Sequence, residues 1–261
     1  MNGELAQLAA LAAHGNAHLA GETVAELFPG NSTFRYVNGV RFRHENDETT
    51  DCLSWWGRLR DGAVTRLGLV RVRPKRRFPG ILEHEAVAFA GGLSAGILTY
   101  SGVDSRDLWR PHWEVTEPNH PDRSIWAIDY AATPPAGVTL QELPGDLGAA
   151  RSRMATALER IRAFAATQEL ESWTPWFDQA LALLASPAPV PPTHPDILPP
   201  VGYSLMARQV LSAAARGWVF GGMGSWNDAD LPDTAYQSVT EEYFEAVMNG
   251  IVAAVNSFKS T

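Results

Sequence analysis

The stretch VTRLGLVRV, residues 64–72, decides the fold class, because it is a run of β-branched and aliphatic residues bounded by turn residues. Asp61-Gly62 stands just before it, and this pair tolerates the positive φ of a two-residue hairpin turn. A second apolar run, residues 55–59, stands on the other side of the pair. We therefore predict a β-hairpin over residues 55–72.

The same strand pattern extends from residue 34 to about residue 133. Apolar and polar residues alternate in the segment 34–42 around Asn38-Gly39, which predicts another hairpin. Turns rather than helices separate the apolar runs, so we expect antiparallel pairing. The further runs that we predict as strands are residues 86–90, 93–100 and 125–130.

Helical spacing of apolar residues marks both ends of the chain. The first helix is predicted from Leu5 to a stop at Gly15, and a second short helix is predicted over residues 24–28. Ser238 and Glu241 match a capping box that predicts the start of a final helix over residues 241–255. Other helices are predicted over residues 147–165, 175–184 and 203–216.

These patterns together predict an α+β fold with a central antiparallel sheet, about residues 34–133, flanked by N-terminal and C-terminal helices. The segment 187–200 is rich in proline, which excludes regular hydrogen-bonded structure. Because the residues after it are too few to bury a core of their own, we predict a single domain, residues 1–261, with a Pro-rich strap at residues 187–200.

Composition limits the classes of partner and cofactor. The net charge of −8 argues against nucleic acid, and the one basic run, residues 71–77, is either an anion-docking segment or a solvated hairpin end. No run approaches the about 18 apolar residues of a membrane span, and the start lacks a basic region, so we expect a cytoplasmic protein. Cys52 is the only cysteine and no histidines are paired at ligand spacing, so we expect no metal and no cofactor.

The segment WVFGGMGSWND, residues 218–228, is the most unusual local sequence. Three glycines within four residues let backbone amides approach a ligand, but neither a P-loop nor a dinucleotide fingerprint is present. A structural turn with Trp218 and Trp226 in the core is the alternative. The candidate ligand-binding residues are Gly222, Gly224, Ser225, Trp226, Asn227 and Asp228, and Gly222 is expected to need an unusual φ.

Two further stretches carry titratable groups. Residues 109–122 combine tryptophans with acids and histidines, and we select His112 and Glu114 as catalytic candidates, against a buried aromatic cluster with a polar loop. Glu83-His84-Glu85 precedes a predicted strand, where alternation would separate His84 from both glutamates.

Two functions follow from these features. The first is a binding or interaction protein with a ligand pocket at residues 221–228, a small molecule or protein as partner, and no nucleic acid or membrane. The wide apolar stripe of the final helix would pack on the sheet or on a second copy in a homodimer. The alternative is a hydrolase that acts on a sugar-like or polar small molecule with acids in the segment 112–122. Convergence of the 221–228 segment, Glu114 and a histidine on one pocket would favour the enzyme.

Overall fold

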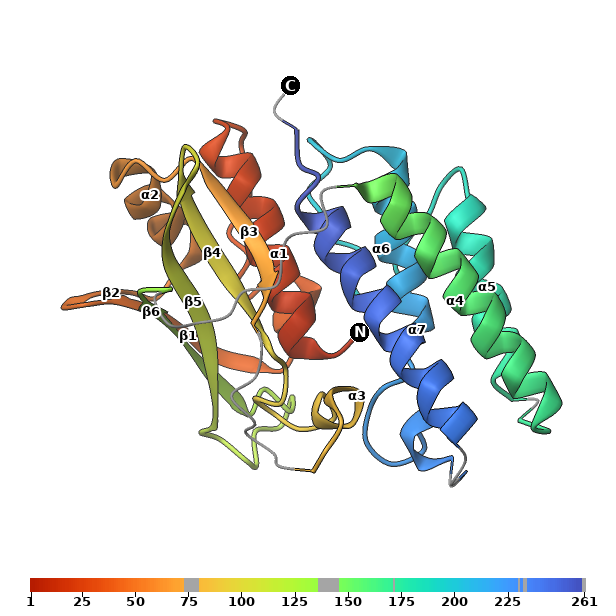
Figure 1. The fold of residues 1–261 in the computed structure, drawn as a ribbon. Helices are drawn as coiled ribbons and strands as arrows, with labels where there is room; N and C mark the ends of the chain where they lie inside the picture. The colour runs from red at the N-terminus through yellow and green to blue at the C-terminus, as the bar shows by residue number, and fades with distance from the viewer. Residues whose placement is uncertain (73–79, 136–145, 171, 230, 232–233, 260–261) are drawn as a thin grey trace.

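The computed structural model describes residues 1–72, 80–135, 146–170, 172–229, 231 and 234–259 (Figure 1). A six-stranded mixed sheet has the strand order β2-β1-β6-β5-β4-β3, and helices from both ends of the chain flank it, which confirms the α+β class. The strands are β1 Val37–His44, β2 Asp47–Thr49, β3 Arg66–Arg71, β4 Ala95–Ser101, β5 Asp104–Val115 and β6 Trp126–Thr133.

Strand pairing follows the expected antiparallel arrangement except at one place. The pairs β1–β2, β3–β4, β4–β5 and β5–β6 are antiparallel, whereas β1 and β6 run parallel. No tight turn joins β1 to β6, so the turn argument does not determine their relative direction.

The hairpin predicted over residues 55–72 is wrong, because residues 52–61 form helix α2, Cys52–Asp61. Asp51 caps this helix by accepting a hydrogen bond from the Ser54 backbone N at 2.7 Å. The apolar residues Trp55, Trp56 and Leu59 recur at helical spacing, and all three are buried. The second hairpin is also wrong: Asn38 and Gly39 lie inside β1, and the turn comes later, between His44 and Asp47.

Three other segments have a different secondary structure from the one predicted. Residues 86–90 are not a strand, since the short helix α3, Glu83–Ala86, ends there and a turn follows. Residues 24–28 form no helix. The longest described strand, β5, covers the first half of the polar-aromatic stretch 109–122, which was not predicted as a strand although apolar and polar residues alternate over residues 109–115.

Helix α1, Gly3–Leu19, lies between the sheet and the C-terminal helices (Figure 1). Gly15 does not stop it: a β carbon at Gly15 would lie 2.4 Å from Leu67 Cδ1 and 2.6 Å from Trp56 Nε1. Gly15 therefore allows close packing against the sheet and α2. The neighbouring Asn16 bonds both backbone groups of Leu67 in β3, each at 2.8 Å, and so fixes α1 to the sheet.

The helices predicted in the C-terminal half are confirmed, and only the start of the last one differs. Helix α7 begins at Thr234, so Ser238 lies inside the helix and is not its cap. It packs mainly between α4 and α6, with further contacts to α1 and β3, rather than over a sheet face. Val247 at its centre is fully buried. The helices are α4 Leu147–Thr167, α5 Thr174–Ala185, α6 Leu205–Gly217 and α7 Thr234–Val255, with 3-10 turns η1 Ser32–Phe34 and η2 Trp226–Asp228.

The structure describes only part of the basic run, and it leaves the domain prediction untested. Arg71 of the basic run is buried and pairs with Glu83 at 2.9 Å and Glu245 at 2.5 Å, while residues 73–77 lie outside the described residues. Residues 187–200 form no helix or strand, and the single domain stays a prediction. Within the described ranges, no helix has the length and apolarity needed to cross a bilayer.

Candidate functional site

A cleft of about 250 Å³ lies at the N-terminal end of α1. Four chain segments that are distant in sequence form its walls: the first turns of α1, residues 33–37, residues 87–90, and the strand ends at Trp113 and Trp126. We call it the aromatic cleft, because the side chains of Tyr36, Phe89, Trp113 and Trp126 all contribute to its lining.

Strand register places the two tryptophans side by side. Trp113 of β5 pairs with Ile128 of β6, and Val115 pairs with Trp126, so both indoles lie on the sheet face that α1 covers. The two rings meet edge to face, with centroids 5.7 Å apart and planes at 81°. This geometry is a favourable one for aromatic pairs, and it fixes the floor of the cleft.

The rim of the aromatic cleft exposes large apolar groups. Tyr36 is 49% exposed and Phe89 is 55% exposed; Val115, which lies outside the cleft lining but two residues from Trp113 on the same strand face, is 46% exposed. Single exposed apolar residues need no explanation, but several around one concave site are informative. The arrangement favours contact with an apolar ligand.

Most polar side chains of the cleft bond within the protein. Asn2 donates to the Val87 carbonyl at 3.0 Å and accepts from the Leu5 amide at 3.0 Å. Gln7 donates to the Thr33 carbonyl at 2.9 Å and accepts from the Tyr130 hydroxyl at 2.8 Å. These bonds hold the walls together and leave few free polar atoms for a ligand.

Two further groups complete the electrostatics of the cleft. Glu4, its one acidic residue, accepts from the Gly91 amide at 3.2 Å. Burial, with smaller contributions from Cys52 and Glu4, raises the pKa of Tyr130 well above its ordinary value. The phenol therefore stays neutral, and its hydroxyl donates a hydrogen bond that holds Gln7 in place. The Nε1 of Trp113 is enclosed and has no acceptor among the described residues.

The segment 83–90 connects the cleft to the Gly-rich loop, residues 221–228. His84 Nδ1 and Asn227 Oδ1 lie 3.0 Å apart, and Asn227 Nδ2 donates to the His84 carbonyl at 2.9 Å. Because Asn227 Oδ1 can only accept, His84 Nδ1 carries the proton in this pair. His84 is helical here, so the separation of His84 from its glutamates by strand alternation is a wrong prediction. The structure thus brings together two of the stretches that the sequence singled out.

The other candidate residues of the Gly-rich loop bond mostly within the loop or to α7. Asp228 accepts from the backbone amides of Gly224 and, at 3.3 Å, Ser225, and the Ser225 hydroxyl donates to the Gly221 carbonyl at 3.0 Å. The buried Trp226 donates from Nε1 to the Thr240 hydroxyl at 2.8 Å. The loop has the bonding of a structural turn, and ligand binding by it stays a prediction.

The glycine with an unusual backbone is Gly224, at φ 82°, and not Gly222. A β carbon at Gly222 would meet no atom within 4 Å, and its φ lies outside the left-handed range. The expectation that Gly222 needs to be glycine is therefore wrong, because the sharp change of direction comes two residues later.

The two catalytic candidates lie away from the cleft. His112 and Glu114 flank Trp113 in β5, so alternation directs them to the opposite, outer sheet face, where both are exposed. His112 pairs in register with Asp129, whose carboxylate accepts from Arg43 Nε at 2.8 Å. Neither candidate lines the aromatic cleft, and neither bonds to the Gly-rich loop in the described part of the chain, so the hydrolase stays a prediction.

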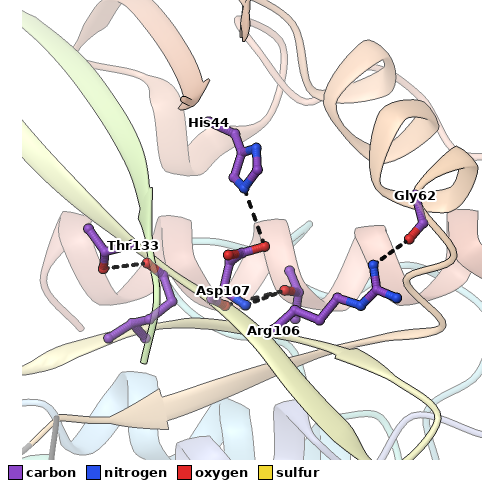
Figure 2. Close-up of polar contacts among 7 residues, drawn as sticks. His44, Gly62, Arg106, Asp107 and Thr133 are labelled. Carbon is purple, nitrogen blue, oxygen red and sulfur yellow. Dashed lines mark hydrogen bonds and ion pairs between the residues drawn. The ribbon is translucent and has the colours of Figure 1, made fainter. Parts of the chain in front are cut away.

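An acid–base pair that sequence reasoning missed lies at the other end of the sheet. Figure 2 shows His44 of β1 directed at Asp107 of β5, with Nε2 and Oδ2 3.6 Å apart. The His44 ring also stacks on Trp109 at 6.2 Å. Nearby, Arg106 donates to the Gly62 carbonyl at 2.9 Å and so fixes the end of α2 to β5. Only strand order could have revealed the pair, since β6 separates β1 from β5.

Neither metal geometry nor similarity identifies the site. In the part of the chain that the structure describes, no three His, Cys, Asp or Glu side chains gather closely enough to hold a metal ion. Comparison with protein-family models, with curated proteins and with solved structures gives no match for this chain.

Proposed function

We propose that this protein is a non-catalytic binding protein whose aromatic cleft accepts a compact aromatic or aliphatic small molecule. The observation that carries the proposal is the half-exposed rim of Tyr36 and Phe89 around a preformed hollow. Ligand sites are typically concave and apolar, with few polar groups, and this cleft has those properties. The proposed ligand-binding site is therefore the aromatic cleft and no longer the Gly-rich loop.

Size and polarity narrow the ligand class. A volume of about 250 Å³ lies just below the roughly 300–1,000 Å³ of drug-sized pockets, so a ligand with one compact ring system fits best. A sugar would need several free donors and acceptors, whereas Asn2 and Gln7 already bond to Val87 and Thr33. The walls therefore favour an apolar ligand over a sugar.

The proposal keeps the cellular setting expected from the sequence. Cys52 is a buried free thiol, and burial, followed by the charge of Glu26, raises its pKa well above the ordinary value, which is compatible with a reducing cytoplasm and an unreactive sulfur. A cytoplasmic location and a homodimer remain parts of this proposal.

The test is a thermal-shift and calorimetric screen with one- and two-ring aromatic compounds such as indole and 4-methylphenol. A compound that binds the folded protein at about 100 times its dissociation constant adds about 2.7 kcal/mol of stability. We expect such a compound to lose at least tenfold in affinity for Ala88→Phe, which places a ring inside the cleft. The same substitution on the exposed surface of α4, Ala166→Phe, is the matched control and should bind as the parent does.

The screen also separates the alternatives. Binding that is equal in Ala88→Phe and the parent would place the ligand elsewhere and contradict the proposal. Turnover of a sugar or an ester that disappears in Glu114→Gln would favour the hydrolase instead. If no compound binds and a purified protein partner protects Phe89 from solvent, the cleft is a protein interface and not a small-molecule site.

A further inference from the structure

The outer face of β1, β6 and β5 carries a group of cations that the proposed function does not use. Arg41 and Arg43 of β1, and Arg110 and His112 of β5, are all exposed on this face. We call Arg41, Arg43 and Arg110 the arginine patch. The patch is unexpected in a chain with a net charge of −8.

Strand register fixes how these side chains are arranged. Arg41, Asp129 and His112 form one row across the three strands, and Arg43, Ala131 and Arg110 form the next row. Residues directly paired on neighbouring strands point to the same face, so each row is a line of adjacent side chains. With strands about 4.8 Å apart, the α carbons of Arg43 and Arg110 lie about 10 Å apart across Ala131.

Two carboxylates neutralise part of this charge: the buried Asp129, and the exposed Glu48 of β2, which pairs in register with Arg43. Asp129 accepts from Nε and NH2 of Arg43, while Arg41 approaches it only to 3.9 Å. Arg110 and His112 have no ion pair or hydrogen bond among the described residues. Glu114, the other acid on this face of β5, lies one row beyond His112, opposite Ala127. Three of the five donors of Arg43 and all those of Arg110 therefore stay available.

Arg43 and Arg110 flank Ala131 on one sheet face, so two positive charges face each other across a position that carries no counter-charge. Ala131 has a short side chain and is partly exposed, so it leaves room between the two arginines for a ligand group. Guanidinium groups bind carboxylate and phosphate through paired, charge-assisted hydrogen bonds. We propose that the arginine patch binds a compact small-molecule polyanion, with one oxyanion group held between Arg43 and Arg110 above Ala131 and with Arg41 closing one side. This inference does not rest on the proposed function of the aromatic cleft.

Calorimetric titration of the full chain with pyrophosphate and with citrate tests the proposal and distinguishes phosphate from carboxylate recognition. We expect Arg110→Gln to weaken binding of the preferred anion at least tenfold. Arg153→Gln is the matched control and should change the affinity less than twofold, because Arg153 is an exposed arginine of α4 that forms no ion pair with any residue that the structure describes. Affinity should also fall with added sodium chloride in the parent.

A second variant keeps the result interpretable. Ala131→Glu places a carboxylate between the two arginines, so it should abolish anion binding while the melting temperature stays the same or rises. Binding that is unchanged in both Arg110→Gln and Ala131→Glu, or no binding of either anion, would overturn the proposal. Tight binding of a single-stranded oligonucleotide with neither small anion bound would also overturn it.

Discussion

The Gly-rich loop and the aromatic cleft share the segment 83–90, but they use this segment in different ways. The loop bonds to its α3 end through Asn227 and His84, and its own polar atoms are mostly bonded internally. The cleft takes its wall from the other end, residues 87–90, and keeps half-exposed aromatic rings around an open volume. The loop has the features of a support, and the cleft those of a surface that contacts other molecules.

A similar support holds the opposite wall of the cleft. Asp196 of the Pro-rich strap accepts hydrogen bonds from the Ser32 hydroxyl and, at 2.9 Å, the Ser32 amide, at the start of η1. His14 of α1 bonds to the Asp196 carbonyl at 3.1 Å. Because η1 forms the start of this wall, residues 33–37, the strap positions the wall from outside. The cleft is thus held from two sides by segments that do not line it.

The largest expected effect separates core from surface within the loop. Trp226 is fully buried and packs edge to face on Trp173 and Phe177, at 5.8 and 5.6 Å. We expect Trp226→Ala to lower the free energy of unfolding by about 3–5 kcal/mol, because it leaves a cavity in this aromatic cluster. Urea unfolding measures the loss, and Met223→Ala, at a fully exposed side chain of the same loop, should change stability by less than about 0.5 kcal/mol. An equal effect of both variants would contradict the structural role of Trp226.

Asn227→Ala should have the next largest effect on stability, because Asn227 bonds the Gly-rich loop to the segment 83–90. It leaves the His84 Nδ1–H and carbonyl without their partners, which costs about 1–3 kcal/mol. Hydrogen exchange should speed up at the amides of residues 85–90, and any cleft ligand should bind more weakly. If exchange in that segment stays at the parent rate, the loop does not support the cleft wall.

A pair of glycine variants gives a smaller and more local effect. Gly224→Ala should lower stability by about 1–2 kcal/mol, because a β carbon is disfavoured at φ 82°. Gly222→Ala should change stability by less than about 0.5 kcal/mol, since its β carbon meets no atom within 4 Å. Thermal unfolding of both variants checks the order, and a reversed order would show that the turn geometry differs.

Acidification should give the smallest effect, through the strap. Burial lowers the pKa of His14 and of His194 below the ordinary 6.5. Below pH 6.5 the unfolded chain therefore takes up protons that the folded chain does not, so stability is full above this pH and falls as the pH approaches the folded pKa values. His14→Gln keeps a donor for Asp196 without titrating, and its melting temperature should fall less between pH 7.5 and 5.5. Parallel pH profiles of parent and variant would contradict this role of His14.

The sequence by itself determined the fold class and the C-terminal helices. Their apolar residues recur over long segments at one period, which local patterns record directly, as the extent of α4 and the burial of Val247 show. A short segment does not reveal its period, because a few apolar residues fit a strand as well as a helix. Residues 55–59 became α2 once Asp51 capped the segment and Trp56 packed beside Gly15 of α1.

Only the tertiary structure decided the candidate sites. The aromatic cleft needs Asn2, Tyr36, Phe89, Trp113 and Trp126, which no local spacing connects. The arginine patch depends on the parallel placement of β1 beside β6, and a shift of one residue would turn its side chains to the other face. The physical reason is that a motif within one segment shows in the sequence, whereas a site built from several segments exists only after strand order and register are fixed.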